Sequence, residues 1–229
     1  MSPQVLTIII QLVVLLFAIS LHEAAHAWMA SRLGDQTARM LGRVTLNPIK
    51  HIDPIGTVLF PLLLAVTHLP VFGWARPTPV NTRNFKRILR DDTLTTLAGP
   101  VSNILGAIAS LAALFAIKLS GQSGYQAVGA AVYRVLAGAD LSTSSFLFPL
   151  ALLLCYAVLI HLALAVFNLL PVPPLDGGHI LRNFLPYRAA QVYDRLGMIS
   201  LFLIFFFGGG IIRGITYPAI RFFFGLLGY

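Results

Sequence analysis

The sequence contains few charged residues and a single glutamate. Asp, Glu, Lys and Arg together make up 10% of the 229 residues, whereas hydrophobic residues make up 57%, and the mean hydropathy is +0.82. Soluble globular domains carry about 25% charged residues, so the composition excludes that class. Several apolar runs reach the roughly 20 residues that a helix needs to cross a bilayer. The composition therefore predicts one all-α, polytopic membrane domain over residues 1–229.

Cysteine and long polar stretches are also scarce. Cys155 is the only cysteine, which excludes an intrachain disulfide. No polar stretch is long enough for an appended soluble domain, and there is no internal repeat. The N-terminal apolar run lacks the basic flank and cleavage site of a signal peptide, so we expect it to be retained. The net charge of +8 resides in short loops between apolar runs, which indicates contact with a lipid bilayer rather than with nucleic acid.

Four apolar runs are predicted to span the membrane. They cover about residues 4–30, 93–118, 146–170 and 196–215. The loops between them are basic at 31–53, 74–92 and 180–195 and weakly charged at 119–145. We expect the tail to form either a further span or an interfacial helix.

Residues 54–72 are apolar but contain three prolines, which favours an irregular, buried path. If this segment crossed the membrane, one of the basic loops beside it would lie on the side that Lys and Arg avoid. We therefore expect a re-entrant segment, four spans, both termini outside and the basic loops in the cytoplasm; six spans is the alternative. The Pro-X-Pro pattern within residues 72–81 favours an extended strand, because a residue before proline avoids helical geometry.

The only glutamate, Glu23, lies between two histidines in an otherwise apolar helix. The segment is His22-Glu23-Ala24-Ala25-His26, and residues four apart share a helix face, so both imidazoles can bind one metal ion. Three polar side chains are costly inside a membrane span, which favours a function over chance. In this pattern the carboxylate takes a proton from water at a zinc ion. The sequence therefore predicts His22 and His26 as zinc ligands and Glu23 as the catalytic base.

Elimination leads to Asp176 as the third ligand. Zinc proteases with a distal glutamate ligand are excluded because Glu23 is the only glutamate. Metzincins are excluded because Met29 and Arg32 stand where they require glycine and histidine. Asp176 follows a proline-rich break at the end of an apolar run and precedes two glycines, which permit a close backbone approach. Asp53 is the second choice, and the other aspartates are expected to be ordinary surface groups: Asp35, Asp91, Asp92, Asp140 and Asp194.

The other four histidines have weaker patterns. We expect His161 to be a hydrogen-bonded core residue rather than a ligand. His179 follows the two glycines and is more typical of a loop, with a role in the site as the alternative. His51 and His68 can line the re-entrant segment, and the sequence assigns neither of them a function.

Three separated motifs resemble the site-2 proteases, a family of intramembrane zinc metalloproteases. These are the His-Glu-Ala-Ala-His segment, Ala-Gly-Pro-Val-Ser-Asn at 98–103, and Phe-Asn-Leu-Leu-Pro-Val-Pro-Pro-Leu-Asp-Gly-Gly at 167–178. Runs at 46–56 and 72–77 resemble the compact prokaryotic branch of this family, which has no PDZ domain. The resemblance covers about residues 15–185.

The resemblance implies that Asp176 joins His22 and His26 around one zinc ion, with Glu23 as the general base. It also implies that Asn168 lies near the site, where its amide could hold the substrate carbonyl or oxyanion; a polar cap at a helix end is the alternative. The segment at 72–81 would correspond to a small membrane-associated β-element that can pair with an unwound substrate.

The predicted function is an intramembrane zinc endopeptidase that cleaves in or near transmembrane segments of membrane proteins, as in regulated intramembrane proteolysis. We expect a multi-pass protein of the cell membrane, with its active site toward the cytoplasm. A transporter or metal permease that uses the His/Asp cluster is one alternative, and a catalytically silent adaptor of the same fold is another. The pattern specifies neither the substrate nor an oligomeric state.

Overall fold

The computed structural model describes residues 3–59, 63, 75–138, 143–195, 197, 199–200 and 209–229. Across these residues the regular secondary structure is helical, and none of them belongs to a strand. The chain divides into two compact units: unit 1 is Met1–Ala18 with Pro100–Tyr229, and unit 2 is Ile19–Gly99. Helices α1 (Pro3–Leu33) and α4 (Ile88–Leu119) each contribute residues to both units.

Three helices in the described part of the chain are long and apolar enough to cross a membrane. They are Val5–Leu33 of α1, α4, and α6 (Phe148–Asn168), so long apolar helices lie where the first three apolar runs predicted them. Helices α1 and α4 have 31 and 32 residues, or about 46–48 Å at 1.5 Å per residue. The hydrocarbon layer is about 30 Å thick, so each of these helices must tilt strongly or extend beyond it.

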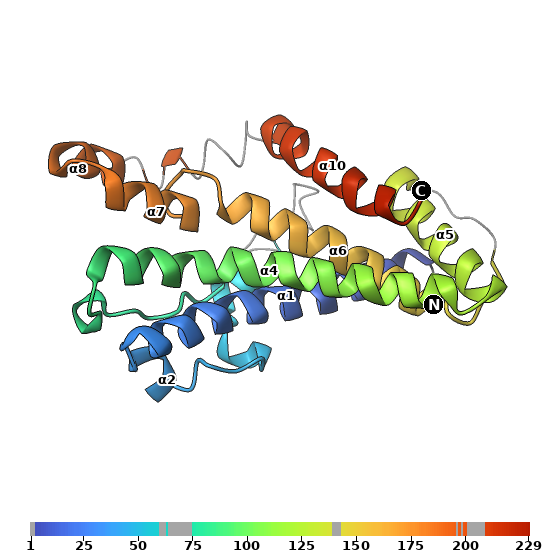
Figure 1. The fold of residues 1–229 in the computed structure, drawn as a ribbon, viewed down its shortest axis with the longest axis horizontal. Coiled ribbons are helices and arrows are strands. Elements are labelled where there is room, and N and C mark those ends of the chain that lie inside the picture. The colour runs from blue at the N-terminus through green and yellow to red at the C-terminus, as the bar shows by residue number, and fades with distance from the viewer. Residues whose placement is uncertain are drawn as a thin grey trace. The chain divides into compact units, whose positions relative to one another are not determined.

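Unit 1 has a hydrophobic core around α6. Helix α6 packs against α5 (Gln122–Ala137) and α10 (Gly209–Leu226), as Figure 1 shows. The fully buried side chains of this core come from several helices and include Leu114, Val128, Leu152, Val158 and Phe224. Helix α10 occupies part of the tail for which a span or an interfacial helix was expected. Half of the last predicted span, 196–215, lies outside the described residues, at 196, 198 and 201–208, and its end falls in α10.

Helix α5 corrects one prediction, because residues 119–145 were expected to form a loop. Its buried face consists of small and β-branched residues at helical spacing: Gly124, Ala127, Val128, Ala130, Ala131 and Val132. This three- and four-residue periodicity is the sign of an amphipathic helix. The prediction relied on the low charge of the segment and overlooked the helical spacing of its apolar residues.

Small residues allow α4 and α6 to approach closely within unit 1. A Cβ added to Gly106 would lie 2.7 Å from the His161 ring, closer than any real Cβ contact. The ring is 2% exposed, and its Nδ1 lies 3.1 Å from Asn103 Oδ1. The prediction that His161 is a hydrogen-bonded core residue is confirmed.

The segment predicted as a basic loop at 180–195 is mostly helical. It contains most of α7 (Asp176–Phe184) and all of α8 (Tyr187–Arg195). Arg182 of α7 donates two hydrogen bonds to Asp194 of α8, at 2.7 and 2.8 Å. These bonds hold the pKa of Asp194 below its ordinary value. Asp194 is therefore a surface group, as predicted, but one that joins two helices.

The described residues of unit 2 form only short elements beyond its shares of α1 and α4. It contains the short elements α2 (Thr37–Met40), η1 (Pro48–Lys50), η2 (Pro54–Leu59) and η3 (Thr82–Asn84). Residues 75–81 precede η3 without forming a strand, so the β-element is not seen in the described part of residues 72–81. The re-entrant segment and His68 fall mainly outside the described residues, at 60–62 and 64–72.

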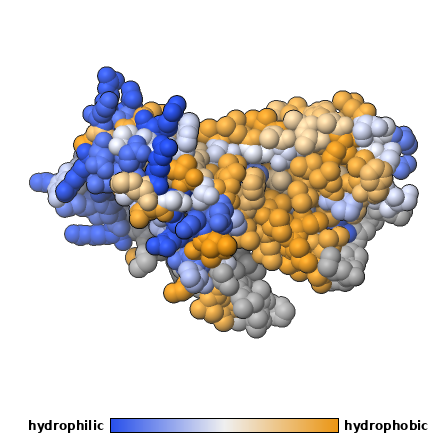
Figure 2. Space-filling model, turned by 90° about the horizontal axis from the view of Figure 1, so that it is seen from below, coloured by the Kyte–Doolittle hydropathy of each residue, from blue (hydrophilic) through white to orange (hydrophobic). Residues whose placement is uncertain are grey.

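Large hydrophobic side chains are exposed on α1 and α4, two of the helices long enough to cross a membrane. Ile8 and Leu12 of α1 are 55% and 53% exposed, and Leu105 of α4 is 60% exposed. Figure 2 shows hydrophobic side chains over a broad part of the face in view. Soluble monomers rarely expose large contiguous apolar areas, so this surface agrees with a protein that lies in lipid.

Candidate metal centre

His22 and His26 form a close pair on one face of α1. Their Nε2 atoms lie 3.0 Å apart, and the two rings meet edge to face, with centroids 4.6 Å apart. The side chains are 7% and 8% exposed. The four-residue spacing therefore brings two imidazole nitrogens to the same point, as the sequence predicted.

The other ring nitrogen of His26 has a fixed partner. Its Nδ1 lies 2.8 Å from the backbone carbonyl oxygen of Thr95 in α4. A carbonyl oxygen can only accept, so Nδ1 carries the hydrogen and Nε2 presents a lone pair. Metal-binding histidines commonly donate their second N–H to a carbonyl in this way, which fixes both the tautomer and the ring orientation.

Gly99, one helical turn after Thr95, leaves space for both rings. A Cβ at this position would lie 2.6 Å from Cε1 of His22 and 2.6 Å from Cε1 of His26, and closer still to His26 Nε2. No side chain other than hydrogen fits there unless the histidines move. The glycine of the Ala-Gly-Pro-Val-Ser-Asn motif thus gives the imidazole pair its room.

The pair fits a zinc ion. Tetrahedral zinc with bonds of about 2.0–2.1 Å to two imidazoles places those nitrogens about 3.3 Å apart, close to the 3.0 Å observed here. Without a metal the same distance suits a hydrogen bond from His22 to the lone pair of His26. Both arrangements need the tautomer of His26 that Thr95 selects.

Glu23 points to a different partner, in the extended segment at 75–81. The backbone N–H of Thr78 donates to Glu23 Oε2 at 2.9 Å, and the Thr78 hydroxyl donates to the same oxygen at 2.7 Å. The hydroxyl oxygen also lies 3.0 Å from the backbone carbonyl oxygen of Glu23. The structure thus binds one carboxylate oxygen of Glu23 to a residue 55 positions away in the chain.

Arg43 binds the backbone of the same segment. This arginine is 5% exposed, and its guanidinium donates to the carbonyl oxygens of Lys50, Arg76 and Pro77. Burial lowers the pKa of the guanidinium, whereas the negative charge of Glu23 acts in the opposite direction. Arg43 therefore joins two loops through their carbonyl oxygens and interacts electrostatically with Glu23.

Asp35 is not the surface group that the sequence suggested. It is 0% exposed and accepts hydrogen bonds from the side chains of Thr37 and Asn84, at 2.6 and 2.7 Å, and from the N–H of Asn81 at 2.8 Å. Burial alone would raise the pKa of this carboxyl group, yet these bonds bring it below its ordinary value. Asp35 anchors the end of the segment that carries Thr78.

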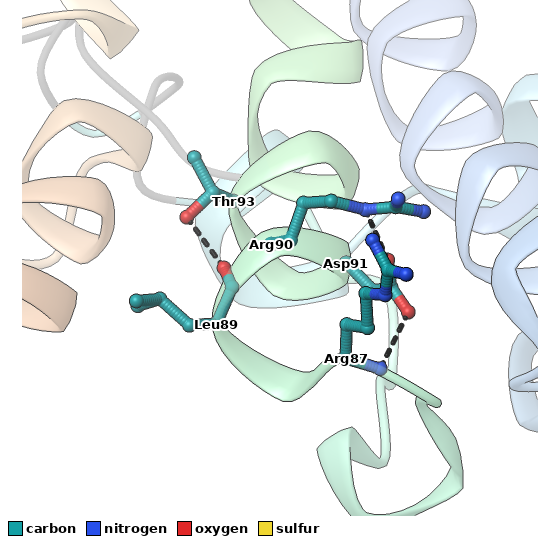
Figure 3. A network of polar contacts seen from close by, with 5 residues as sticks. All are labelled: Arg87, Leu89, Arg90, Asp91 and Thr93. Carbon is teal, nitrogen blue, oxygen red and sulfur yellow. Dashed lines mark hydrogen bonds and ion pairs between the residues drawn. The ribbon is translucent and has the colours of Figure 1, made fainter.

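Asp91 and Asp92 correct the same expectation, since they are 2% and 6% exposed. Figure 3 shows Asp91 in the first turn of α4, where it accepts from the N–H of Arg87 at 2.9 Å and from Nε of Arg90 at 3.0 Å. An aspartate in this position satisfies backbone donors that the helix leaves open. The charge pattern was misleading for Asp91 because the Arg90 side chain and the Arg87 N–H bind its carboxylate within the fold.

Asp176 lies in unit 1, at the N-terminus of α7. The glycines after it allow a close backbone approach, as predicted. A Cβ on Gly177 would lie 2.6 Å from the carbonyl oxygen of Leu170, and one on Gly178 would lie 2.7 Å from the nitrogen of Pro173. The turn between α6 and α7 is therefore compact only because both residues lack side chains.

Asn168 is the last residue of α6. Its Nδ2 donates to the carbonyl oxygen of Leu164 at 2.9 Å, one turn earlier in the same helix. This bond is the helix-end interaction that was the alternative to a role toward substrate. The amide group has a second hydrogen, which this bond does not use.

The remaining candidates have structural partners. Asp53, the second choice as a ligand, accepts from the N–H groups of Ile55 and Gly56 at 3.0 and 2.7 Å. His51 is 1% exposed, with Nε2 2.8 Å from the carbonyl oxygen of Thr45. His179 lies within the first turn of α7 rather than in a loop.

Sequence reasoning missed Thr78, Arg43, Thr95 and Gly99 as parts of this site. Gly99 stands in a motif that was noted, and Thr78 stands in the noted Pro-Thr-Pro pattern, but neither position indicates a contact with the histidines or with Glu23. Arg43 looked like one of many loop cations. The signal in each case is a contact between distant segments, which local patterns do not contain.

Comparisons with known proteins agree with the motifs. The model of peptidase family M50 matches residues 10–208, a range that includes all three motifs. The Bacillus subtilis (strain 168) protein named "Putative zinc metalloprotease YwhC" is 37% identical over 196 residues, which are 85% of this chain and 78% of that protein. The Mycobacterium tuberculosis (strain H37Rv) protein named "Putative zinc metalloprotease Rip2" is 26% identical over 194 residues, 83% of this chain and 64% of that protein. No solved structure gives a significant match.

Proposed function

Because the chain belongs to peptidase family M50, a family of membrane zinc metalloproteases, we propose that it is an endopeptidase that cleaves membrane-protein substrates in or near their transmembrane segments. The observation that carries this proposal is the pair of Nε2 atoms 3.0 Å apart beside the only glutamate. The hydrogen bond from His26 Nδ1 to Thr95 supports it, because it leaves Nε2 as an acceptor for a metal. Regulated intramembrane proteolysis is the corresponding biological process.

We propose His22, His26 and Asp176 as the ligands of one zinc ion. Two imidazoles and one carboxylate are a ligand set of catalytic zinc sites, which keep a fourth position open. A bound zinc ion would polarise the scissile carbonyl group and make water acidic enough to lose a proton near neutral pH. The glycines after Asp176 support its role, since they let the turn after α6 fold tightly against the start of α7, where Asp176 lies.

Glu23 is the proposed general base. It takes a proton from the attacking water and returns it to the leaving amine. Both donors of Thr78 contact Oε2, so Oε1 is the oxygen that we assign to the proton transfer. Asn168 is proposed to donate its second amide hydrogen to the oxyanion, as donors in such sites do.

The substrate is proposed to be a transmembrane segment that unwinds locally, since helical carbonyl groups are shielded by their own hydrogen bonds. Its unwound part would pair with a membrane-associated β-element at 72–81. The full proposal is one protease domain over residues 1–229, in the cell membrane with several spans, with lipid and transmembrane proteins as partners. Four spans with a re-entrant segment and a site facing the cytoplasm follow from the distribution of basic residues.

The experiment compares the membrane proteomes of cells that produce the wild type or Glu23→Gln. We expect transmembrane precursors to accumulate with Glu23→Gln, while the purified variant keeps its zinc because the ligands are unchanged. Asp194→Asn, a carboxyl-to-amide change at an exposed ion pair, is the matched control and should resemble the wild type. Identical precursor levels with the wild type and Glu23→Gln would rule out the protease. Zinc flux in proteoliposomes that is independent of Glu23 would favour a permease instead.

A further inference from the structure

Thr78 is placed so that its donors converge on Glu23. It lies between Pro77 and Pro79, which have no amide hydrogen, so it carries the only N–H of that tripeptide. This N–H and the Thr78 hydroxyl both donate to Oε2 of Glu23, at 2.9 and 2.7 Å. Two donors on one carboxylate oxygen restrain the side chain more strongly than a single bond, because both its direction and its rotation are defined.

The segment around Thr78 is itself held in place. The N–H of Arg76 donates to the carbonyl oxygen of His51 at 2.9 Å, and the guanidinium of Arg43 donates to the carbonyl oxygens of Arg76 and Pro77. Proline fixes its own φ, and the residue before a proline is restricted to extended geometry. Thr78 is therefore presented by a stiff backbone that is hydrogen-bonded through both the N–H and the carbonyl groups just before it.

A general base needs this kind of support because proton transfer depends on short distances. A glutamate side chain has three rotatable torsions, and a misplacement of about 1 Å can lower a rate about 100-fold. Glu23 and Thr78 are both in unit 2, together with His22 and His26. The contact thus lies in the same unit as the imidazole pair beside which the base must act.

We infer that Thr78 is a positioning residue for Glu23. Its two donors occupy Oε2 and thereby direct Oε1 toward the attacking water. Arg43 holds the Pro-Thr-Pro segment in place through the carbonyl oxygens of Arg76 and Pro77. This inference rests on the proposed protease function, because it assumes that Glu23 is the base. It assigns a catalytic purpose to a segment whose pattern alone indicates only extended backbone.

The first test is independent of proteolysis. Hydrogen–deuterium exchange of the purified full-length protein is followed in the peptide that contains residues 75–81, where the two prolines leave few amides to report. Glu23→Ala removes the acceptor, so exchange at the Thr78 amide should accelerate at least about 10-fold, whereas Glu23→Gln keeps an acceptor oxygen and should change it much less. Equal exchange in Glu23→Ala and the wild type overturns the inference, whatever the enzyme does.

The second test measures cleavage of fluorescently labelled β-casein, an unfolded protein, by zinc-loaded enzyme in detergent. Thr78→Val should lower kcat about 10- to 100-fold with KM and zinc content unchanged, and Thr78→Ser, which retains the hydroxyl, should stay within about threefold of the wild type. Thr93→Val is the matched control, since it removes a hydroxyl that donates to the carbonyl oxygen of Leu89 and should leave kcat unchanged.

The outcomes separate the inference from the function. If Glu23→Gln is inactive and Thr78→Val has the wild-type kcat, the positioning role is wrong and the protease assignment stands. A higher kcat in Thr78→Val would also overturn the inference, because Thr78 would then act as a latch on Glu23. If the wild type cleaves no better than Glu23→Gln, the function and the inference fail together.

Discussion

The substitution Gly99→Ala offers a sharp test of the imidazole pair as a metal site. The added Cβ would lie 2.6 Å from Cε1 of both His22 and His26, and ordinary contact begins at 3.4 Å. Each ring must therefore move by at least about 0.8 Å, four times the roughly 0.2 Å by which zinc–ligand distances vary. The His26 ring cannot swing aside easily, because its Nδ1 is held by the carbonyl oxygen of Thr95 at 2.8 Å.

We expect Gly99→Ala to weaken zinc binding at least about 10-fold, which corresponds to about 1.4 kcal/mol. Substitution of residues that merely hydrogen-bond to metal ligands already lowers metal affinity about 10- to 100-fold. The value of about 10-fold for Gly99→Ala is therefore a lower bound. Proteolysis should fall in parallel. The assay is zinc content by mass spectrometry after equilibration with a competing chelator, with thermal unfolding measured on the same preparation.

Gly225→Ala is the matched control, since nothing lies within 4 Å of a Cβ at that position of α10. It should keep full zinc affinity and stabilise the helix by up to about 1 kcal/mol, because alanine has a higher helix propensity than glycine. If Gly99→Ala binds zinc as tightly as the control does, then His22 and His26 do not hold the metal in the observed arrangement.

Three further predictions concern other parts of the chain. Asp176→Asn should lower zinc affinity at least about 10-fold, while Asp194→Asn should not; equal affinities would remove Asp176 from the ligand set. The folded-state pKa of Asp35 is below its ordinary value, so its contribution is complete above about pH 4 and is lost as pH falls further. The unfolding temperature of Asp35→Asn should therefore lie below that of the wild type at pH 7, by the equivalent of about 1–3 kcal/mol, and the gap should narrow below pH 4; a constant gap would contradict the assignment. Gly177→Ala should destabilise the protein by about 3 kcal/mol, because its Cβ meets backbone carbonyl groups, whereas Gly214→Ala, with open space around it, should not; equal unfolding temperatures would contradict this packing.

The three long apolar helices were predictable because a helix that can lie in lipid needs a long, uninterrupted apolar run. The expected runs at 4–30, 93–118 and 146–170 correspond to helices that end within a few residues of those limits. The amphipathic helix α5 was missed, since its small buried residues contribute little to a hydropathy pattern and its few charges resembled a loop. Helices α7 and α8 were missed for a related reason, because their basic surface outweighed their apolar face.

Aspartates were the least predictable residues. A carboxylate among arginines looks like a solvated surface group, yet Asp35 and Asp91 are almost completely buried. Each is stabilised by donors that are invisible as a pattern: the side chains and N–H groups of a distant segment for Asp35, and the N–H at the start of a helix for Asp91. Burial of a charge depends on how many donors the fold delivers to it, and that number is not a property of composition.

The pairing of His22 with His26 follows from the sequence alone, because the α-helix has a fixed period and residues four apart must share a face. The uniqueness of Glu23 likewise narrows the ligand set without any coordinates. The contacts around these residues come from folding: Thr95 orients one imidazole, Gly99 makes room for both, and Thr78 binds the carboxylate. Helical spacing is a local property, whereas these contacts join segments up to 77 positions apart and exist only where the packed chain brings them together.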